Sequence, residues 1–354
     1  METILREHIA PIVIAAQNPV QRGFTPPMNA SLLVEEMYRD VLNTRQSSKL
    51  VLLDAKAAFD VVVYTHTHTH MLRRLFQAGL DDNPWTIIQS MHEGASSAIK
   101  WNGKISDQFK VLQGVRQGGI LNTDLYKLYV NPLLDRLTSS NIGLKIGNVV
   151  CNTSACADDI ALMSRNEVDM LIQINMSNDF AAMERYRLQL QKSISIQIKP
   201  KSTKMASAPV EYTLGKDQMP NVERAVHLGI IRTTSAPDNI KENVDENMKK
   251  ARRSVYALFD CGFHGENGLD PETMIHLFKT YITPVLLYGM EVLIPKGKYL
   301  EQLDKFQKKM IKQLLSISSN TPDSAIYILT GLLPIEAQIH IHIHYLVWEC
   351  MSSR

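Results

Sequence analysis

Three aspartates occupy positions in this 354-residue sequence where carboxylates can do chemistry. Asp54 follows the apolar run 50–53, and the pair Asp158-Asp159 follows the small Ala157 between two further apolar runs. Hard cations such as Mg²⁺ prefer carboxylate oxygens as ligands, and adjacent unpaired carboxylates repel one another. Two such ions about 3.5–4 Å apart can bind both the attacking and the leaving oxygen of a phosphoryl transfer. The alternative is that the Asp-Asp pair is only a turn.

The elements that carry these aspartates decide whether they meet. Residues 50–53 predict a buried strand that ends at Asp54. Residues 149–164 predict a hairpin with the aspartate pair at its tip. If the strand and the hairpin lie side by side in one sheet, the three carboxylates converge at one edge of that sheet.

Further helices and strands are expected around this sheet. They are a helix over 71–78, a hairpin over 97–112 around Asn102-Gly103, a glycine-rich loop over 112–120, a helix over about 166–186 and a strand over 194–198. Asn122, Thr123 and Asp124 are residue types that favour a helix N-cap after the loop. Pro132 is expected to kink or end the first half of that helix.

The last third of the chain differs in pattern and charge. Residues 1–180 hold 16 Lys and Arg against 18 Asp and Glu, and residues 181–354 hold 22 against 18. A mixed α/β body is expected to about residue 232, followed by helices over 240–259, 271–283, 299–315 and 334–350. Basic residues cluster there, including Lys305, Lys308, Lys309 and Lys312. Such a cluster suits a polyanion, because neutralised phosphates release counterions, and a solvated helix face is the alternative.

The composition excludes several classes of protein. Apolar residues make up 45% and charged residues 21%, which is ordinary globular usage and not that of a disordered or fibrous chain. The four cysteines form no C-x-x-C pair, so neither a disulfide framework nor a zinc ribbon is indicated. No apolar stretch approaches the roughly 18 residues of a membrane span. We expect an intracellular protein without a membrane partner.

Two histidine tracts alternate with threonine or isoleucine, at residues 65–70 and 340–344. Alternating histidines on a strand share one face and can bind a metal ion. On a helix, alternate positions point about 200° apart and the cluster dissolves. A repeated CA-rich codon run that slipped during replication is a genetic explanation for both tracts.

The order of aspartate strand, Q-G-G loop and A-D-D hairpin resembles the reverse transcriptases, above all those of non-LTR (LINE-type) retrotransposons. The resemblance covers nearly the whole chain. The matching strings are QRGFTPPMNASLL at 21–33, LLDAKAAFDVV at 52–62, LQGVRQGGILNTDLYKLYVNPLL at 112–134, CADDIALMS at 156–164, YRLQLQKSISI at 186–196, HLGI at 227–230 and YITPVLLYGMEV at 281–292.

The resemblance implies a metal centre and its substrates. Asp54 and Asp158 are the principal ligands of two Mg²⁺ ions in this interpretation, with Asp159 as a supporting carboxylate and Mn²⁺ as a possible substitute metal. Lys192 matches a lysine proposed as general acid for pyrophosphate, with a solvated lysine as the alternative. The implied partners are an RNA template, a DNA primer and dNTPs.

The resemblance also implies residues that contact the substrates. Phe59 matches the aromatic steric gate that excludes a ribose 2′-hydroxyl, although it can also be an ordinary core phenylalanine. Gln117 and Gly118 match the loop that lies against the nascent base pair. Arg116 either contacts template or triphosphate or is an exposed loop arginine. Residues 227–230 resemble the primer-grip region.

The implied fold is an α+β right-hand polymerase with a ferredoxin-like palm. Residues 1–50 would be a remnant of the fingers, 51–232 the palm with an inserted fingers hairpin at about 80–118, and 233–354 a helical thumb with a C-terminal extension. Cys156 replaces the commoner Tyr or Phe before A-D-D. Because the sequence begins about twenty residues before QRGF, truncated fingers and a 5′-truncated copy are expected.

The leading functional hypothesis is an RNA-directed DNA polymerase that works by two-metal phosphoryl transfer. The alternative is a catalytically dead retrotransposon remnant that still binds nucleic acid through its basic helices. A remoter hypothesis is an RNA-directed RNA polymerase, but Phe59 disfavours it because an RNA-making site must admit the 2′-hydroxyl. Retrotransposition implies a nuclear location at some stage, with the cytoplasm as an alternative.

Overall fold

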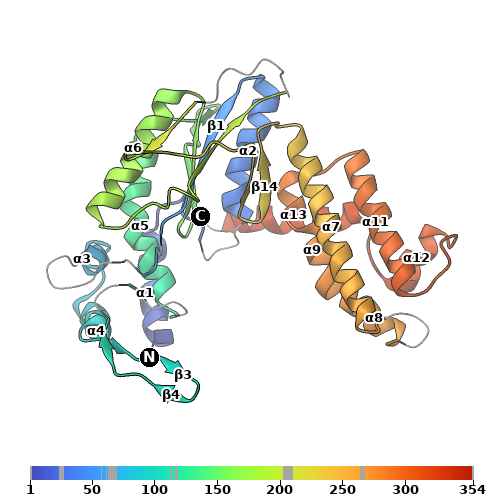
Figure 1. The fold of residues 1–354 in the computed structure, drawn as a ribbon, viewed down its shortest axis with the longest axis horizontal. Helices are drawn as coiled ribbons and strands as arrows, with labels where there is room; N and C mark the ends of the chain where they lie inside the picture. The colour runs from blue at the N-terminus through green and yellow to red at the C-terminus, as the bar shows by residue number, and fades with distance from the viewer. Residues whose placement is uncertain are drawn as a thin grey trace. The chain divides into compact units, whose positions relative to one another are not determined.

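The computed structural model describes residues 2–23, 28–56, 58–60, 62, 70–111, 114–115, 119–201, 210–263 and 268–352. The chain divides into two units, Met1–Glu223 and Arg224–Arg354 (Figure 1). The first unit is built around a sheet, and the second is mostly helical. Each unit is described by itself.

A four-stranded antiparallel sheet forms the centre of the first unit. Its strand order is β10 (Ile194–Ile198), β1 (Ser48–Leu53), β9 (Asp159–Ser164) and β8 (Thr153–Cys156). All six residues of β1 are buried, which agrees with an apolar run flanked by a strand on each side. The predicted strands at 50–53 and 194–198 are confirmed. The predicted hairpin at 149–164 is confirmed over 153–164, while residues 149–150 pair with 145–146 instead.

Six helices lie in the described part of the first unit, and α5, α6 and α2 lie along the sheet (Figure 1). They are α1 (Glu2–Ala16), α2 (Met28–Thr44), α3 (His70–Gln77), α4 (Asp82–His92), α5 (Asn122–Ser139) and α6 (Glu167–Met183). Val51 and Leu162 pack with α5 and α6 in one apolar cluster, while α2 contacts β8 and β9. The period-2 alternation of strands explains how β1 serves a core on each face.

Four two-stranded sheets are described in the first unit besides the central one: β2 (Ser96–Ser97) with β5 (Phe109–Lys110), β3 (Lys100–Trp101) with β4 (Lys104–Ile105), β6 (Lys145–Ile146) with β7 (Val149–Val150), and β11 (Thr213–Leu214) with β12 (Asp217–Gln218). The first two are the outer and inner parts of one hairpin. Asn102 and Gly103 both have positive φ, as a tight two-residue hairpin turn requires. The predicted hairpin at 97–112 is therefore confirmed, and its strand residues are all exposed.

The second unit opens with a hairpin and continues with helices. Its elements are β13 (Arg224–His227), β14 (Ile230–Thr233), α7 (Asp238–Asp260), α8 (Pro271–Leu277), a π-helical turn (Phe278–Ile282), α9 (Thr283–Leu287), α10 (Met290–Leu293), α11 (Lys298–Leu314), α12 (Asp323–Thr330) and α13 (Ile335–Ser352). The helix expected over 271–283 is three segments, because Pro284 has no N–H for a regular helical bond and the backbone widens before it.

The expected N-cap of α5 is wrong, and the helix does not end at Pro132. The helix begins at Asn122 with Leu121 in the cap position, and Leu121 makes no side-chain cap bond. The Asp124 carboxylate pairs instead with Arg6, 3.0 Å away, and lies 3.7 Å from the ammonium of Lys127. The helix also runs through Pro132 without ending, because most of its residues are buried and tertiary packing overrides the local preference.

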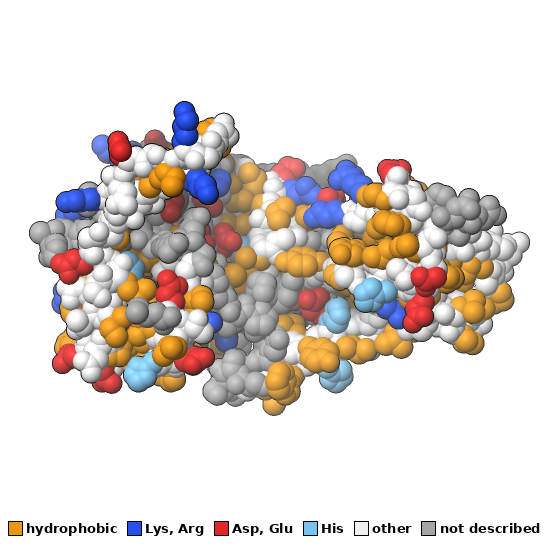
Figure 2. Space-filling model, turned by 90° about the horizontal axis from the view of Figure 1, so that it is seen from below, with side chains coloured by type: hydrophobic (Ala, Val, Ile, Leu, Met, Phe, Trp, Pro, Cys, Tyr) orange, Lys and Arg blue, Asp and Glu red, His pale blue; other side chains and the backbone are white. Residues whose placement is uncertain are grey.

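Apolar side chains appear at the surface among charged ones on the face drawn in Figure 2. Among the described residues, Ile328 of α12 and Trp348 of α13 are 82% and 66% exposed. No single described helix is long and apolar enough to cross a membrane; only the bent pair formed by α12 and residues 335–348 meets that criterion together.

Candidate active site

The register of the sheet brings Asp54, Asp159 and Lys192 to one edge. Leu53 pairs with Ile160 of β9 and Leu52 with Ile194 of β10, so the next residue of β1 reaches both neighbours at their ends. The Asp54 amide donates to Ser193 Oγ at 3.2 Å, which fixes the backbone at this point. Lys192 Nζ lies 3.9 Å from Asp54 Oδ2. We call Asp54, Asp158 and Asp159 the carboxylate edge.

The second part of the edge is the tight turn between β8 and β9. Cys156 pairs with Asp159, and Ala157 and Asp158 form the two-residue loop. Ala157 has φ +59°, the left-handed region that usually requires glycine in such a turn. The sequence placed the aspartate pair at the hairpin tip, and the structure resolves this further: Asp158 lies in the loop and Asp159 begins β9.

The ionised form of each carboxylate of the pair is disfavoured by its surroundings. Burial raises the pKa of Asp158, and the charge of Asp54 adds to that rise. The pKa of Asp159 is raised to about 6 by burial of the carboxyl and by the charges of Asp158 and Asp54, although the residue as a whole is exposed. Lys192 opposes both shifts, but its side chain is 63% exposed and its charge is screened.

The donor set of the carboxylate edge suits divalent cations. Across the described residues, no three His, Cys, Asp or Glu side chains form a ready-made metal cluster. The charge of Asp54 nevertheless raises the pKa of Asp158, and the charges of Asp158 and Asp54 raise that of Asp159, so a cation between the carboxylates would relieve that repulsion. Mg²⁺ commonly takes only one or two protein carboxylates and fills its shell with water and phosphate oxygens. The residues present therefore fit such an ion.

Phe59 lies in the turn that follows Asp54. Its ring centroid is 4.6 Å from that of Tyr126 on α5, with the planes tilted by 31°. Tyr126 is buried, and its pKa is raised by that burial, by Tyr186 and by Asp158. Sequence analysis did not single out Tyr126, although the motif 112–134 contains it. The stack fixes the plane of the predicted gate residue.

The predicted residues Arg116, Gln117 and Gly118 lie outside the described residues. The described start of their loop is bonded to the Phe59 turn: the Val115 amide donates to the Phe59 carbonyl at 2.7 Å. Gly114 has φ +93°, and a Cβ there would lie 2.8 Å from the Asp60 carbonyl oxygen. The glycine is required for this close approach.

Gln21 is a site residue to which sequence analysis assigned no role. It is fully buried, and its side-chain amide binds the backbone of Ala157, next to Asp158. The only sequence signal was the string QRG, which belongs to the family resemblance.

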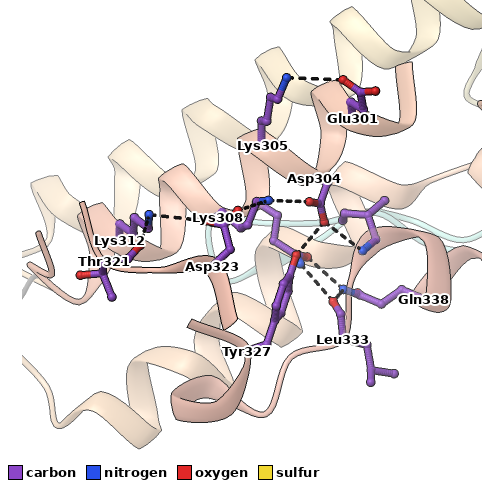
Figure 3. Close-up of polar contacts among 12 residues, drawn as sticks. Glu301, Asp304, Lys305, Lys308, Lys312, Thr321, Asp323, Tyr327, Leu333 and Gln338 are labelled. Atoms are coloured by element: carbon purple, nitrogen blue, oxygen red, sulfur yellow. Dashed lines mark hydrogen bonds and ion pairs between the residues drawn. The ribbon is translucent and has the colours of Figure 1, made fainter. Parts of the chain in front are cut away.

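Four of the five lysines of α11 fall into two pairs, and Figure 3 shows Lys305, Lys308 and Lys312 among them. Lys308 Nζ lies 2.8 Å from Asp304 Oδ2 and 2.6 Å from Asp323 Oδ2. Lys312 Nζ lies 3.6 Å from Asp323 Oδ1 and donates to the carbonyl oxygens of residues 319 and 321. We call Asp304, Lys308, Lys312 and Asp323 the lysine network.

The other two lysines face outward. Lys305 is 3.5 Å from Glu301, with both side chains more than two thirds exposed, and Lys309 is exposed. All four lysines line a surface pocket of about 640 Å³. Lys308 and Lys312 are already held by acceptors of the protein, whereas Lys305 and Lys309 face outward, so binding of a polyanion by the cluster stays a prediction.

The predicted grip residues 227–230 form the turn of the β13–β14 hairpin. Leu228 and Gly229 both have positive φ, and the Tyr288 hydroxyl donates to the Leu228 carbonyl at 3.0 Å. A Cβ on Gly229 would lie 2.6 Å from the Tyr288 ring. Two of the strings that carry the resemblance thus pack against each other within the second unit. Burial lowers the pKa of His227 to about 3.

The histidine tracts give no metal site in the described part of the chain. Residues 340–344 lie on α13, so their histidines do not share one face. The tract 65–70 lies outside the described residues, apart from the backbone of His70.

Comparison with solved structures identifies the architecture. The structure of apo telomerase from Candida tropicalis superposes with a TM-score of 0.50, covering 100% of this chain and 58% of the other at 10% sequence identity. At that identity the likeness concerns the fold alone. The predicted α+β right-hand polymerase fold is confirmed.

Comparison of sequences identifies the family. Residues 1–213 match the family described as "Reverse transcriptase (RNA-dependent DNA polymerase)", and the chain belongs to that family. The Pol polyprotein of the type-2 retrotransposable element R2DM of Drosophila melanogaster is 24% identical over 314 residues, covering 86% of this chain and 28% of that protein.

A Pol polyprotein of the type-1 retrotransposable element R2 of Popillia japonica is 23% identical over 322 residues, covering 88% of this chain and 43% of that protein. The chain thus spans less than half the length of these two relatives. The prediction of a non-LTR reverse transcriptase domain is confirmed, and at the level of the family so is the enzyme class, an RNA-directed DNA polymerase.

Proposed function

We propose that the chain extends a DNA primer on an RNA template, with Asp54 and Asp158 as principal metal ligands and Asp159 as their support. The observation that carries this proposal is the register of β1, β9 and β10, which sets the end of β1 beside Asp159 and Lys192. The raised pKa of both hairpin carboxylates supports it, because a bound cation would stabilise their charge.

The chemistry follows from the charges at the edge. Two divalent ions, Mg²⁺ or Mn²⁺, would activate the primer 3′-hydroxyl and neutralise the leaving pyrophosphate. Asp54 and Asp158 hold that charge in place, and positioning and electrostatics do the rest of the work. Lys192, 63% exposed and 3.9 Å from Asp54, is able to turn toward the leaving group and give it a proton.

Sugar selection is assigned to Phe59. The Tyr126 ring behind it limits how far the Phe59 ring can retreat from a 2′-hydroxyl. Phe59→Val removes the bulk, so incorporation of rNTPs relative to dNTPs is expected to rise at least tenfold. Phe76→Val, which changes a phenylalanine that is 61% exposed on α3, is the matched control.

The two units receive different roles in this proposal. The first unit carries the predicted fingers and the predicted palm as far as Glu223, including Phe59 and the loop with Gln117 and Gly118, while residues 224–232 of the predicted palm belong to the second unit. The second carries the predicted thumb, where Lys305 and Lys309 meet the phosphates of the template–primer duplex. A nuclear location at some stage is part of the same proposal.

The test is primer extension by the purified chain with an RNA template, a DNA primer, dNTPs and Mg²⁺. Asp158→Asn is expected to abolish extension, while Asp217→Asn, which removes an exposed carboxylate from β12, leaves the rate unchanged. EDTA stops the reaction and Mn²⁺ restores it.

Two results would contradict the proposal. Salt-sensitive binding of primer–template without any extension would identify a catalytically dead, nucleic-acid-binding protein. Extension with rNTPs alone would identify an RNA-directed RNA polymerase.

A further inference from the structure

The side chain of Gln21 forms hydrogen bonds with both the N–H and the C=O of Ala157, a residue of the candidate catalytic turn. Its Oε1 accepts from the Ala157 amide at 2.9 Å, and its Nε2 donates to the Ala157 carbonyl at 3.1 Å. The same Oε1 accepts from the Gly23 amide at 2.8 Å. The Gln21 side chain is fully buried, and its bond with Gly23 is buried as well, while the two bonds with Ala157 are part-buried.

The backbone around Gln21 is fastened to β8. The Ala155 amide donates to the Val20 carbonyl at 3.1 Å, and the Arg22 amide donates to the Ala155 carbonyl at 2.8 Å. Gln21 itself forms a parallel bridge with Ala155. A Cβ on Gly23 would lie 2.3 Å from the Ala157 nitrogen, so only glycine allows this approach. The segment therefore has a fixed place against the turn.

The turn needs such support because of its own sequence. Ala157 stands at φ +59° in a two-residue hairpin loop, where a non-glycine residue in the left-handed region costs about 1–2 kcal/mol. Such a conformation persists only where the surroundings fix it. Gln21 supplies a partner for the N–H and for the C=O of this residue, one position before Asp158.

We propose that Gln21 is a positioning residue that holds Ala157 left-handed and so presents Asp158 to the metal. This inference rests on the proposed function of the carboxylate edge. The contact joins positions 136 apart in the sequence, which makes the N-terminal segment part of the active site. Without the side-chain amide of Gln21, Ala157 leaves the left-handed conformation, and the Asp158 carboxylate moves away from its position beside Asp54.

The test compares Gln21→Met with Gln173→Met. Gln173 is also fully buried and donates a single bond to the Asn152 carbonyl, before β8 begins. Both changes remove a buried amide at similar volume, and the larger fall in Tm is expected for Gln21→Met, because its side chain makes three hydrogen bonds and that of Gln173 makes one. Only Gln21→Met is expected to lower kcat, by at least tenfold, with KM for dNTPs and affinity for primer–template within about twofold.

Metal binding is measured directly, by the electron paramagnetic resonance signal of free Mn²⁺ during titration. Gln21→Met is expected to weaken Mn²⁺ binding at least fivefold, and Gln173→Met to leave it unchanged. Adding Ala157→Gly to Gln21→Met is expected to restore part of both kcat and Mn²⁺ affinity, because glycine adopts the left-handed conformation without support. A merely structural glutamine would not be rescued in this way.

The outcomes separate this inference from the proposed function. If Gln21→Met keeps the kcat and the Mn²⁺ affinity of the unchanged chain, Gln21 has no positioning role. If the unchanged chain binds Mn²⁺ through Asp158 but extends no primer, the proposed polymerase activity fails while the Mn²⁺ titrations still decide the role of Gln21. A chain that binds no Mn²⁺ overturns both.

Discussion

The carboxylate edge of the first unit and the lysine network of the second use the same kinds of residue in opposite ways. At the edge, three aspartates share one largely exposed lysine whose ammonium is 3.9 Å from the nearest carboxylate oxygen. The pKa of both hairpin carboxylates is raised. In the network, Lys308 lies within 2.8 Å of Asp304 and 2.6 Å of Asp323.

The pKa shifts in the network run the other way. Burial alone would raise the pKa of Asp304, but hydrogen bonds from Lys308 and Tyr327 hold it below its usual value. The hydrogen bond from Lys308 lowers the pKa of Asp323 as well. Opposite charges that pair within the protein stabilise its fold. Like charges that face one another destabilise the fold, and binding a ligand of opposite charge relieves their repulsion.

The largest expected effect contrasts Asp54→Asn with Asp304→Asn. We expect Asp54→Asn to lower the rate of primer extension about 1,000-fold or more and to leave Tm unchanged or higher, because it removes repulsion at the edge. Asp304→Asn should lower Tm and leave kcat within about threefold. Extension kinetics and thermal unfolding of both variants measure the two effects. If each variant loses both activity and stability, the contrast between the carboxylate edge and the lysine network is wrong.

The second prediction concerns Lys308, the centre of the network. Lys308→Met removes the ammonium that joins Asp304 and Asp323 and leaves Lys312, 3.6 Å from Asp323, as the remaining cation of the network. We expect a loss of about 2 kcal/mol in unfolding free energy, less than for a fully buried pair because the lysine side chain is 16% exposed. Urea unfolding checks it, and adding Asp304→Asn should recover part of the loss. If Lys192→Met lowered the unfolding free energy by as much as Lys308→Met does, the carboxylate edge would be paired as strongly as the lysine network.

The sequence was informative where local pattern decides the structure. The apolar run 50–53, the turn at Asn102-Gly103 and the aspartate pair of the hairpin predicted their elements correctly, because strand alternation and turn chemistry are local. The sequence also predicted that Asp54 lies near Asp158 and Asp159, on the assumption that the strand and the hairpin belong to one sheet.

The failures arose where distant contacts decide. Pro132 does not interrupt α5, since burial on several sides outweighs the missing hydrogen bond. Gln21 meets its turn across 136 positions, and no local spacing marks such a pair. The four clustered lysines of α11 share one helical spacing in sequence. Lys308 and Lys312 differ from the other two because Asp323 of α12 and the loop carbonyls at 319 and 321 reach them, and these are contacts that the spacing does not mark.

The third prediction uses the pKa of Asp159, which is about 6 in the folded, metal-free chain against an ordinary 3.8. Between these values the folded state holds more protons than the unfolded state, so stability falls as pH rises, and the full penalty is present above about pH 6. Asp159→Asn should therefore stabilise the chain at pH 7 in EDTA and change nothing near pH 3.

The size of that gain is about 1 kcal/mol, since an exposed residue is partly screened by water. Asp304→Asn has the opposite sign: the stability that it removes is present above the ordinary pKa and is lost only as pH falls below it. Tm measured from pH 3 to pH 8 for both variants distinguishes the two signs, and parallel curves would show that the two regions are electrostatically alike.

The smallest effect is expected for the outward lysines. Lys309→Gln removes one exposed ammonium and should weaken binding to an RNA–DNA duplex a few-fold near 0.15 M salt, lowering the slope of log affinity against log salt by about 1. Lys312→Gln removes an ammonium already bonded to the carbonyls of Ser319 and Thr321, so it should lower Tm and leave the slope unchanged. Titrations at four salt concentrations measure both. Equal slopes for the two variants would mean that the lysine network breaks its internal ion pairs when the duplex binds, and that its lysines then contact phosphates.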